Sequence, residues 1–314
     1  MTGLIRPITL VNVILAIITN ALGQEPVPSP SATITQVTRV SQDEPVMSPD
    51  GKTILFQSDI DGPFNLFMMD REGRHVVRLT RHQTSDDGGI WSPDGKQVAF
   101  SSTDRATGIS EIFVISAVGS GEHQITHDRA FNIHPAWSPD GRSIMYTSTK
   151  ESKDPRYGHA DVWQTYVVSA NGKDQHKLAV EGPVNTYGSW SPDGTKILIR
   201  RKPSNDSKIS QVYAMNSDRT GLTNLTNDSS YNRYPSWSPS GRQIVFTSDR
   251  AGHSQILIMN ADGSDTKVWV DGPGTLTAPR FTPDGKTILY SRDFENELKI
   301  FSVPVAESQA PAAK

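Results

Sequence analysis

One tetrapeptide recurs six times along this chain of 314 residues, and it limits the possible fold more than any other feature. It reads Ser-Pro-Asp-Gly four times, then Ser-Pro-Ser-Gly, then Thr-Pro-Asp-Gly. The copies are 44, 46, 53, 47 and 44 residues apart and begin at Ser48, Ser92, Ser138, Ser191, Ser238 and Thr282. A period of about 40–50 residues is typical of a four-stranded propeller blade. The sequence therefore predicts an all-β fold, a six-bladed β-propeller of four-stranded antiparallel blades.

Each repeat contains the same order of strands and turns. Pro sets φ at the second turn position, and Asp-Gly supports a tight reversal between two strands. Alternating segments such as 96–100 and 111–115 predict the second and third strands, and a short outer strand ends in Ile125-Thr126. A large side chain precedes every turn, where it would fill the space between neighbouring blades. These side chains are Met47, Trp91, Trp137, Trp190, Trp237 and Phe281.

The two ends of the repeat region predict how the ring closes. The sixth repeat ends after its third strand, at residues 298–303, whereas residues 33–38 (TITQVT) precede the first turn with no blade before them. An open propeller would leave two unpaired strand edges. We therefore expect residues 33–38 to complete the sixth blade. The propeller would span residues 33–305, and residues 306–314 would form a disordered tail.

The N-terminus is the most apolar part of the chain. Arg6 precedes an apolar run at residues 8–18, and small residues follow at 21–23. This order predicts a signal peptide over residues 1–23, with residues 24–32 as a linker. An uncleaved anchor is the alternative, but spanning a bilayer takes roughly twenty apolar residues. We expect a periplasmic or secreted protein that is not inserted in the membrane after cleavage.

Composition excludes several classes of function. The chain has no cysteine, which excludes disulfides, thiolate catalysis and cysteine-bound zinc. Its 31 Lys and Arg residues against 34 Asp and Glu residues leave no positive excess for nucleic acid. No Gly-x-Ser-x-Gly motif is present, so the nucleophile elbow of α/β-hydrolases is missing. We predict no catalytic residue, and binding is the favoured role.

The fifth repeat resembles the repeats of TolB-like propellers. The resemblance rests on residues 234–241 (YPSWSPSG), 244–250 (IVFTSDR) and 258–263 (IMNADG), and it extends over about residues 33–305. It implies the fold more strongly than a function, because one fold hosts many activities. TolB has an α/β domain before its propeller, which we do not expect here. The resemblance implies a monomeric binding or scaffold module for a protein or peptide partner in the cell envelope, or for a small polar or carbohydrate ligand.

Propellers bind ligands at the mouth of the central channel, on the loops that enter the innermost strands. The repeats can be aligned on the large residue before each turn. The candidate residues lie three to five positions before it. They are Glu44, Asp86, Asp87, His134, Tyr187, Arg233 and Tyr234. The fifth position is Asn in three blades, at Asn132, Asn185 and Asn232, where it is either a structural cap or part of the rim.

Acidic residues gather in the first two repeats. Asp43, Glu44, Asp86 and Asp87 would approach the axis from adjacent blades. Several TolB-like proteins hold calcium in the channel, and hard oxygen ligands suit this ion. The resemblance therefore suggests calcium, with a solvated acidic rim as the alternative. No other cofactor is expected.

One enzymatic alternative remains open at this stage. Oligogalacturonate lyases are similar propellers with a histidine-rich manganese site, so a metal-dependent polysaccharide lyase is the rival function. Of the eight histidines, only His134 is predicted to face the channel. An insertion at residues 150–161 lengthens the loop between the second and third strands of the third blade. Its Arg156, Tyr157 and His159 are either ligand contacts or part of a neutral surface loop.

Overall fold

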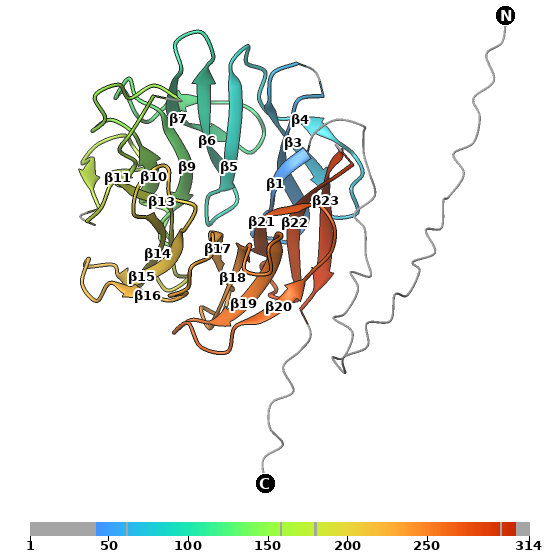
Figure 1. Ribbon diagram of the computed structural model, residues 1–314. Coiled ribbons are helices and arrows are strands. Elements are labelled where there is room, and N and C mark those ends of the chain that lie inside the picture. Colours follow the sequence, from blue (N-terminus) through green and yellow to red (C-terminus); the bar gives the residue numbers. More distant parts are fainter. Residues whose placement is uncertain (1–41, 61, 158, 179–180, 296, 306–314) are drawn as a thin grey trace, which may run out of the picture.

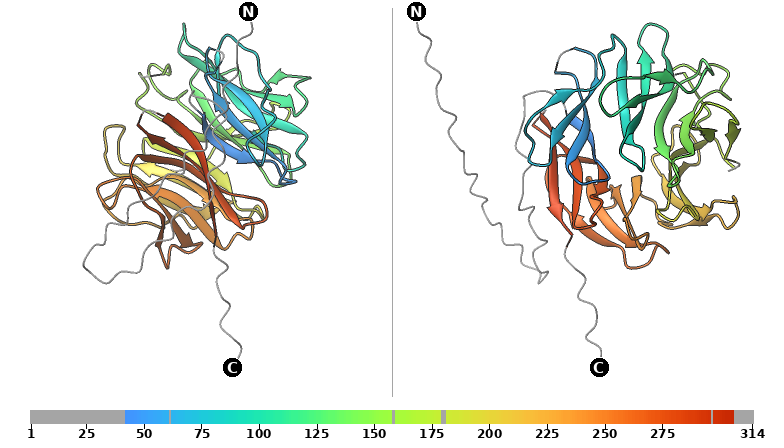
Figure 2. Two further views of the ribbon diagram at one scale, coloured as in Figure 1. Left: turned by 90° about the vertical axis from the view of Figure 1, so that its right-hand side faces the viewer. Right: turned by 180° about the vertical axis from the view of Figure 1, so that it is seen from behind.

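A computed structural model describes residues 42–60, 62–157, 159–178, 181–295 and 297–305. Within these ranges the chain forms six antiparallel sheets arranged as a ring, and the innermost strand of each sheet faces the centre (Figure 1). Two further views show the same sheets from the side and from behind (Figure 2). No helix suited to crossing a membrane occurs in the described segments. The predicted all-β, six-bladed propeller is confirmed.

The strands follow the chain from the inside of each blade to its outside. The first three blades comprise β1 (Gln42–Met47), β2 (Thr53–Ser58), β3 (Asn65–Asp70) and β4 (Val77–Arg78); β5 (Ser85–Trp91), β6 (Gln97–Asp104), β7 (Ile109–Ser116) and β8 (His123–Gln124); and β9 (Asn132–Trp137), β10 (Ser143–Ser148), β11 (Gln164–Ser169) and β12 (His176–Lys177). The last three comprise β13 (Val184–Trp190), β14 (Lys196–Lys202), β15 (Gln211–Asn216) and β16 (Thr223–Asn224); β17 (Arg233–Trp237), β18 (Gln243–Ser248), β19 (Gln255–Asn260) and β20 (Lys267–Val270); and β21 (Thr275–Phe281), β22 (Thr287–Phe294) and β23 (Glu297–Pro304).

The repeated tetrapeptide forms the turn between the first two strands of each blade. In the second blade, the Ser92 hydroxyl donates to Asp94 Oδ1 at 2.7 Å, and the backbone N–H of Lys96 donates to the same oxygen at 3.1 Å. These hydrogen bonds, with the Ser92 hydroxyl first, lower the pKa of Asp94. Gly95 has φ +71°, a left-handed conformation that glycine adopts without a Cβ clash. The motif therefore shapes the backbone.

We expect Gly95→Ala to destabilise the protein by about 1 kcal/mol, because φ is positive there. A Cβ at this position would approach Pro49 Cδ no closer than 3.5 Å, so the cost would come from the backbone and not from a clash. Urea unfolding of the variant measures this difference. An unchanged midpoint would contradict the turn's proposed role. Ligand preference should not change, since the turn lies away from the channel mouth.

The large residue before each turn packs between blades, as predicted. Trp91 joins a buried cluster that includes Leu55 and Leu66 of the first blade and Phe100 of the second. Its indole N–H donates to the backbone carbonyl of Val46 at 3.2 Å. Apolar burial of this kind contributes roughly 25 cal/mol per Å². The tryptophans thus join sheets that share no ladder hydrogen bonds.

A second, polar connection between blades involves the three repeated asparagines. Asn132 donates to Glu111 Oε2 of the preceding blade at 2.8 Å, and Asn185 donates to Gln164 Oε1 at 3.1 Å. Asn232 donates to Asp228 Oδ1 at 2.9 Å. All three side chains are fully buried. These buried hydrogen bonds support a structural role over a place on the rim, but Asn132 and Asn185 reach the preceding blade and do more than cap a turn.

The sixth blade has three strands, β21, β22 and β23, within the described ranges. Its neighbour across the ring closure is the first blade (Figure 1). Phe56 and Phe67 of the first blade pack with Leu289 and Ile300 of the sixth. Residues 33–38 lie outside the described residues, so closure by the N-terminal strand stays a prediction. The signal peptide, the linker and the C-terminal tail also lie outside them.

Candidate binding site at the channel mouth

Residues from all six blades line a small cavity at the centre of the ring, and among them is one residue at the same position of every repeat. All six occupy the third position before the large residue, and each has a positive φ between 48° and 62°. The pairing of the first two strands shifts register at this point in every blade, which marks a β-bulge. The bulge turns the side chain toward the channel. The six residues, called here the channel ring, are Glu44, Gly88, His134, Tyr187, Tyr234 and Ala278.

Aromatic side chains fill one side of the channel ring. The His134 and Tyr187 rings are stacked with centroids 4.1 Å apart, and Tyr234 meets Tyr187 edge-on at 4.9 Å. The remaining cavity has a volume of about 50 Å³, enough for a few water molecules. The channel ring therefore closes the channel, so a ligand would approach it from the mouth.

Most channel-ring positions carry a side chain although their backbone conformation favours glycine. A bulky residue at positive φ is uncommon and costs on the order of 1 kcal/mol or more, whereas glycine fits without strain. Glycine occupies this position in the second blade, at Gly88, yet Tyr187 and Tyr234 adopt φ of 55° and 53°. Strain of this kind gathers at functional sites. This favours a role for the side chains themselves.

The opposite side of the channel ring is acidic. Burial, together with the charges of Asp43 and Asp87, raises the pKa of Glu44 to about 8, although Arg280 acts in the opposite direction. Burial raises the pKa of Asp87 to about 6, although the Ser101 hydroxyl donates to that carboxylate. At neutral pH Glu44 is therefore mostly protonated, and it can donate as well as accept a hydrogen bond.

Burial also controls the protonation of His134. It lowers the pKa of the imidazole to about 3, and the positive charges of Arg200 and Arg280 act in the same direction. The ring is therefore neutral over the physiological range. Its Nδ1 atom is buried and has no hydrogen-bond partner among the described residues. A neutral imidazole stacked on Tyr187 is suited to recognition of a ligand.

The prediction that Asp86 lines the mouth is wrong. Asp86 is fully buried and accepts hydrogen bonds from the Ser102 hydroxyl at 2.7 Å and from His82 Nδ1 at 3.0 Å. It occupies the same position as the repeated asparagines, and like them it is held by hydrogen bonds within the protein. Asp86 raises the pKa of His82, which also contacts Glu122. The burial of Asp86 is thus decided by its position in the repeat and not by the charge of its side chain.

The four acidic residues do not converge as a cation site. Asp86 points toward His82, whereas Asp43 accepts hydrogen bonds from the Glu44 N–H at 2.8 Å and from Thr277 at 3.4 Å. Across the described ranges, no three His, Asp or Glu side chains come close enough to hold one metal ion. Calcium usually takes six to eight oxygen ligands. Calcium binding at the mouth therefore stays a prediction, and no set of three converging carboxylates in the described residues supports it.

Beside the channel ring lies a pocket of about 580 Å³, formed by the third and fourth blades. His134 and Tyr187 belong to both the channel ring and this pocket. The predicted Arg233 lies near it, with its guanidinium carbon 5.5 Å from the Tyr234 ring centroid. The pocket therefore offers access to ring residues that the narrow channel does not.

Sequence reasoning missed Arg200 and Lys202, which line this pocket at the end of β14. The sequence did contain a signal for Arg200, namely a charge at a position that is uncharged in the other repeats. Arg200 is the sixth residue after the turn glycine of its repeat. The equivalent residues of the other blades are uncharged. They are Gln57, Ser101, Thr147, Thr247 and Ser291. Comparison of the second strands would have singled out Arg200.

The insertion follows β10 as predicted and forms part of the pocket. Ala160 and Asp161, near its end, line the outer side. Tyr157 instead packs against Phe131, with the rings tilted by 42° and their centroids 4.9 Å apart, and Arg156 pairs with Asp154. His159 is also close to Asp154, at 3.5 Å. The three residues predicted as ligand contacts therefore interact with the protein itself, and other insertion residues reach the pocket.

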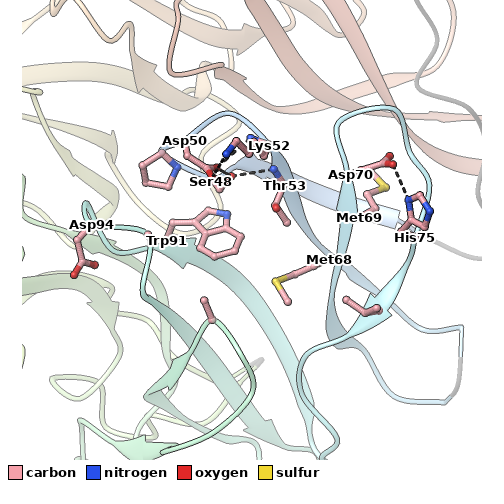
Figure 3. A pocket seen from close by; sticks show the side chains of 14 residues that line it. Ser48, Asp50, Lys52, Thr53, Met68, Met69, Asp70, His75, Trp91 and Asp94 are labelled. Atoms are coloured by element: carbon pink, nitrogen blue, oxygen red, sulfur yellow. Dashed lines mark hydrogen bonds and ion pairs between the residues drawn. The ribbon is translucent and has the colours of Figure 1, made fainter.

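A separate crevice of about 490 Å³ lies on the face that carries the repeated turns (Figure 3). It is formed between the first two blades, with Trp91 and Met68 in its wall and the Asp70–His75 ion pair at one side (Figure 3). Similar crevices separate neighbouring turns elsewhere in the ring. Their recurrence marks them as products of the repeat, and we place the candidate site at the channel mouth.

Comparison with known proteins agrees with this architecture. Residues 91–212 and 203–312 match the model of the PD40 family, the TolB β-propeller domain. The Tol-Pal system protein TolB of Anaeromyxobacter dehalogenans is 33% identical over 91 residues, which are 29% of this chain and 20% of that protein. The chain thus spans only a small part of this relative.

Solved structures show the same fold at low identity. TolB from Acinetobacter baumannii superposes with a TM-score of 0.65 at 22% identity, covering 77% of this chain and 57% of that one. An oligogalacturonate lyase in complex with manganese superposes with a TM-score of 0.58 at 15% identity, covering 90% of this chain and 96% of that one. These likenesses show the fold alone. The family model matches most of the chain, and the six repeats agree with that match. The chain therefore belongs to the TolB β-propeller domain family.

Proposed function

We propose that this protein is an exported, periplasmic or secreted binding module. Its channel mouth would hold a polar ligand or a segment of a protein partner in the cell envelope. The observation that carries the proposal is the channel ring, where bulky side chains are kept at positive φ in blades that could use glycine. The apolar N-terminal segment supports export. The relative named as a Tol-Pal system protein supports a partner in the envelope.

Recognition would rest on the aromatic half of the channel ring and on Arg233. Tyrosine and arginine commonly dominate binding energy where they are partly desolvated. Tyr187 and Tyr234 are half-buried, and the Arg233 guanidinium lies over the Tyr234 ring. A partner that enters the mouth would cover these groups without unfolding the blades.

Tyr234→Ala tests this proposal. We expect at least a tenfold loss of affinity for any ligand found by titrating the protein with envelope-protein peptides and with oligosaccharides, because a main aromatic contact is removed. Tyr213→Ala is the matched control, since Tyr213 lies on β15 and packs against Arg201, away from the channel ring. Equal losses in both variants, or no loss in Tyr234→Ala, would contradict a site at the channel ring.

The rival function is a metal-dependent polysaccharide lyase, to which the lyase likeness lends support at the level of the fold. In this chain His134 is the one channel-ring histidine, and it is stacked on Tyr187. Turnover on polygalacturonate with added manganese or calcium tests the rival. Robust cleavage that disappears in His134→Ala would overturn the binding proposal and make this protein an enzyme.

A further inference from the structure

The pocket beside the channel ring has an inner wall of unusual charge. Arg200 and Lys202 line it. Arg233 is near them, since all three side chains contact the ring of Tyr231. Within the described ranges none of the three forms an ion pair, whereas Lys150, Lys177 and Arg250 in the neighbouring blades are paired with Asp128, Glu151 and Asp228.

Aromatic rings hold the cations in place. The Arg200 guanidinium carbon lies 5.0 Å from the centroid of Tyr187 and 5.6 Å from that of Tyr231, and Nη1 donates to the Tyr231 hydroxyl at 3.2 Å. Lys202 Nζ and the Arg233 guanidinium each lie 5.6 Å from the Tyr231 centroid. Ring faces attract cations but leave their charge uncompensated. The inner wall therefore carries a positive potential.

Polar atoms without partners lie in the same wall. Thr186 is 3% exposed and lines the pocket, and its hydroxyl has no hydrogen-bond partner among the described residues. Arg200 Nε also lacks one there. A buried polar atom left without a partner is unfavourable, because it has lost its hydrogen bonds to water. Both groups would gain from an acceptor placed against this wall.

The outer rim limits the charge that the pocket can accept. Asp161 and Asp206 line it from the insertion and from the loop after β14, and both are exposed. A doubly charged phosphate would face these carboxylates. A carboxylate carries one charge, and its two oxygens match the fork of one guanidinium.

We infer that this pocket binds the carboxylate group of a small acidic ligand, with Arg200 as the main anchor and Lys202 as a second cation. The inference rests on the proposed binding function and names the ligand chemistry for it. The volume of about 580 Å³ is within the usual range for small-ligand sites. The carboxylate could belong to an acidic sugar or to a short acidic peptide, and these sources differ in the rest of the molecule.

Titration calorimetry with four probes tests the inference: galacturonate, the dipeptide glycyl-glutamate, galactose and inorganic phosphate. We expect at least one carboxylate probe to bind the wild type, and galactose and phosphate to bind at least tenfold more weakly. Binding by galacturonate alone would identify an acidic sugar as the source, and binding by the dipeptide alone would identify a peptide. Equal affinity for galactose, preference for phosphate, or no binding of either carboxylate would overturn the inference.

Arg200→Gln should weaken carboxylate binding by about 10- to 100-fold, since a charge-assisted hydrogen bond contributes about 1.5–3 kcal/mol. Arg242→Gln is the matched control, because it makes the same change on an exposed turn at the opposite face. If Arg200→Gln unfolds, Lys202→Gln provides the same test with a smaller expected loss. Unchanged affinity in a folded Arg200→Gln protein would refute the assignment.

Failure of this inference can be told apart from failure of the proposed function. If Tyr234→Ala loses a peptide or glycan ligand but the wild type does not bind simple carboxylates, the channel-ring site stands and the carboxylate assignment is wrong. If carboxylate binding depends on Arg200 but not on Tyr234, the carboxylate assignment stands and the channel-ring site is wrong.

Discussion

Glu44→Gln is expected to raise the melting temperature at pH 8.5 and to have little effect at pH 5. Burial raises the pKa of this carboxyl to about 8, whereas in the unfolded chain it titrates near 4.5. The folded state therefore holds the proton more tightly, and stability falls as pH rises from about 4.5 to 8. At about 1.4 kcal/mol per pKa unit, the loss at high pH is on the order of a few kcal/mol. Gln removes the ionisation and should restore several degrees.

The measurement is a pair of melting curves at pH 5 and pH 8.5 in EDTA. Glu72→Gln is the control, because Glu72 lies exposed in a turn and pairs with Arg71 and Arg74. It should not reproduce the pH-dependent gain. A Glu44→Gln protein less stable than wild type at pH 8.5 would show that the ionised carboxylate stabilises the fold through Arg280, and this would contradict a raised pKa. With excess calcium, stabilisation of wild type that is absent from Glu44→Gln would show that calcium binds and that Glu44 takes part.

Deleting residues 24–39 is expected to lower the melting temperature by about 5–10 °C. Each of the other five blades has a fourth strand of two to four residues, from β4 (Val77–Arg78) to β20 (Lys267–Val270). The corresponding strand of the sixth blade is predicted to be residues 33–38. Its loss would remove a few backbone hydrogen bonds of about 1 kcal/mol each and the packing over β23. It would also leave a strand edge open to self-association.

The deletion should be compared with a chain that lacks residues 306–314, for which we expect no change in melting. Light scattering would report association of the exposed edge. If the deletion of residues 24–39 melts like the full mature chain, the N-terminal strand does not close the ring.

The architecture could be predicted because its determinants are local and repeated six times. The turn at Ser92-Pro93-Asp94-Gly95 forms from its own hydrogen bonds and from a glycine at φ +71°. A large apolar side chain such as that of Trp91 is buried between blades. The convergence of Glu44, His134, Tyr187 and Tyr234 was also predictable, since equal positions in equal repeats meet at the axis.

The chemistry of the site depended on contacts that no single repeat contains. Asp86 carries a charge suited to a rim, but its backbone position buries it beside His82 and Ser102, between two blades. Glu44 owes its raised pKa to burial and to Asp43 and Asp87, and the latter comes from another blade. The role proposed for Arg200 depends on its contacts with Tyr187 and Tyr231 and on the nearby Thr186. By itself, the sequence determined the strands, the turns and which positions face the axis, because these follow from short-range backbone preferences and hydrophobic period. Only the tertiary structure decided which polar side chains are buried, paired or left free, because burial and charge at the channel mouth are set jointly by several blades.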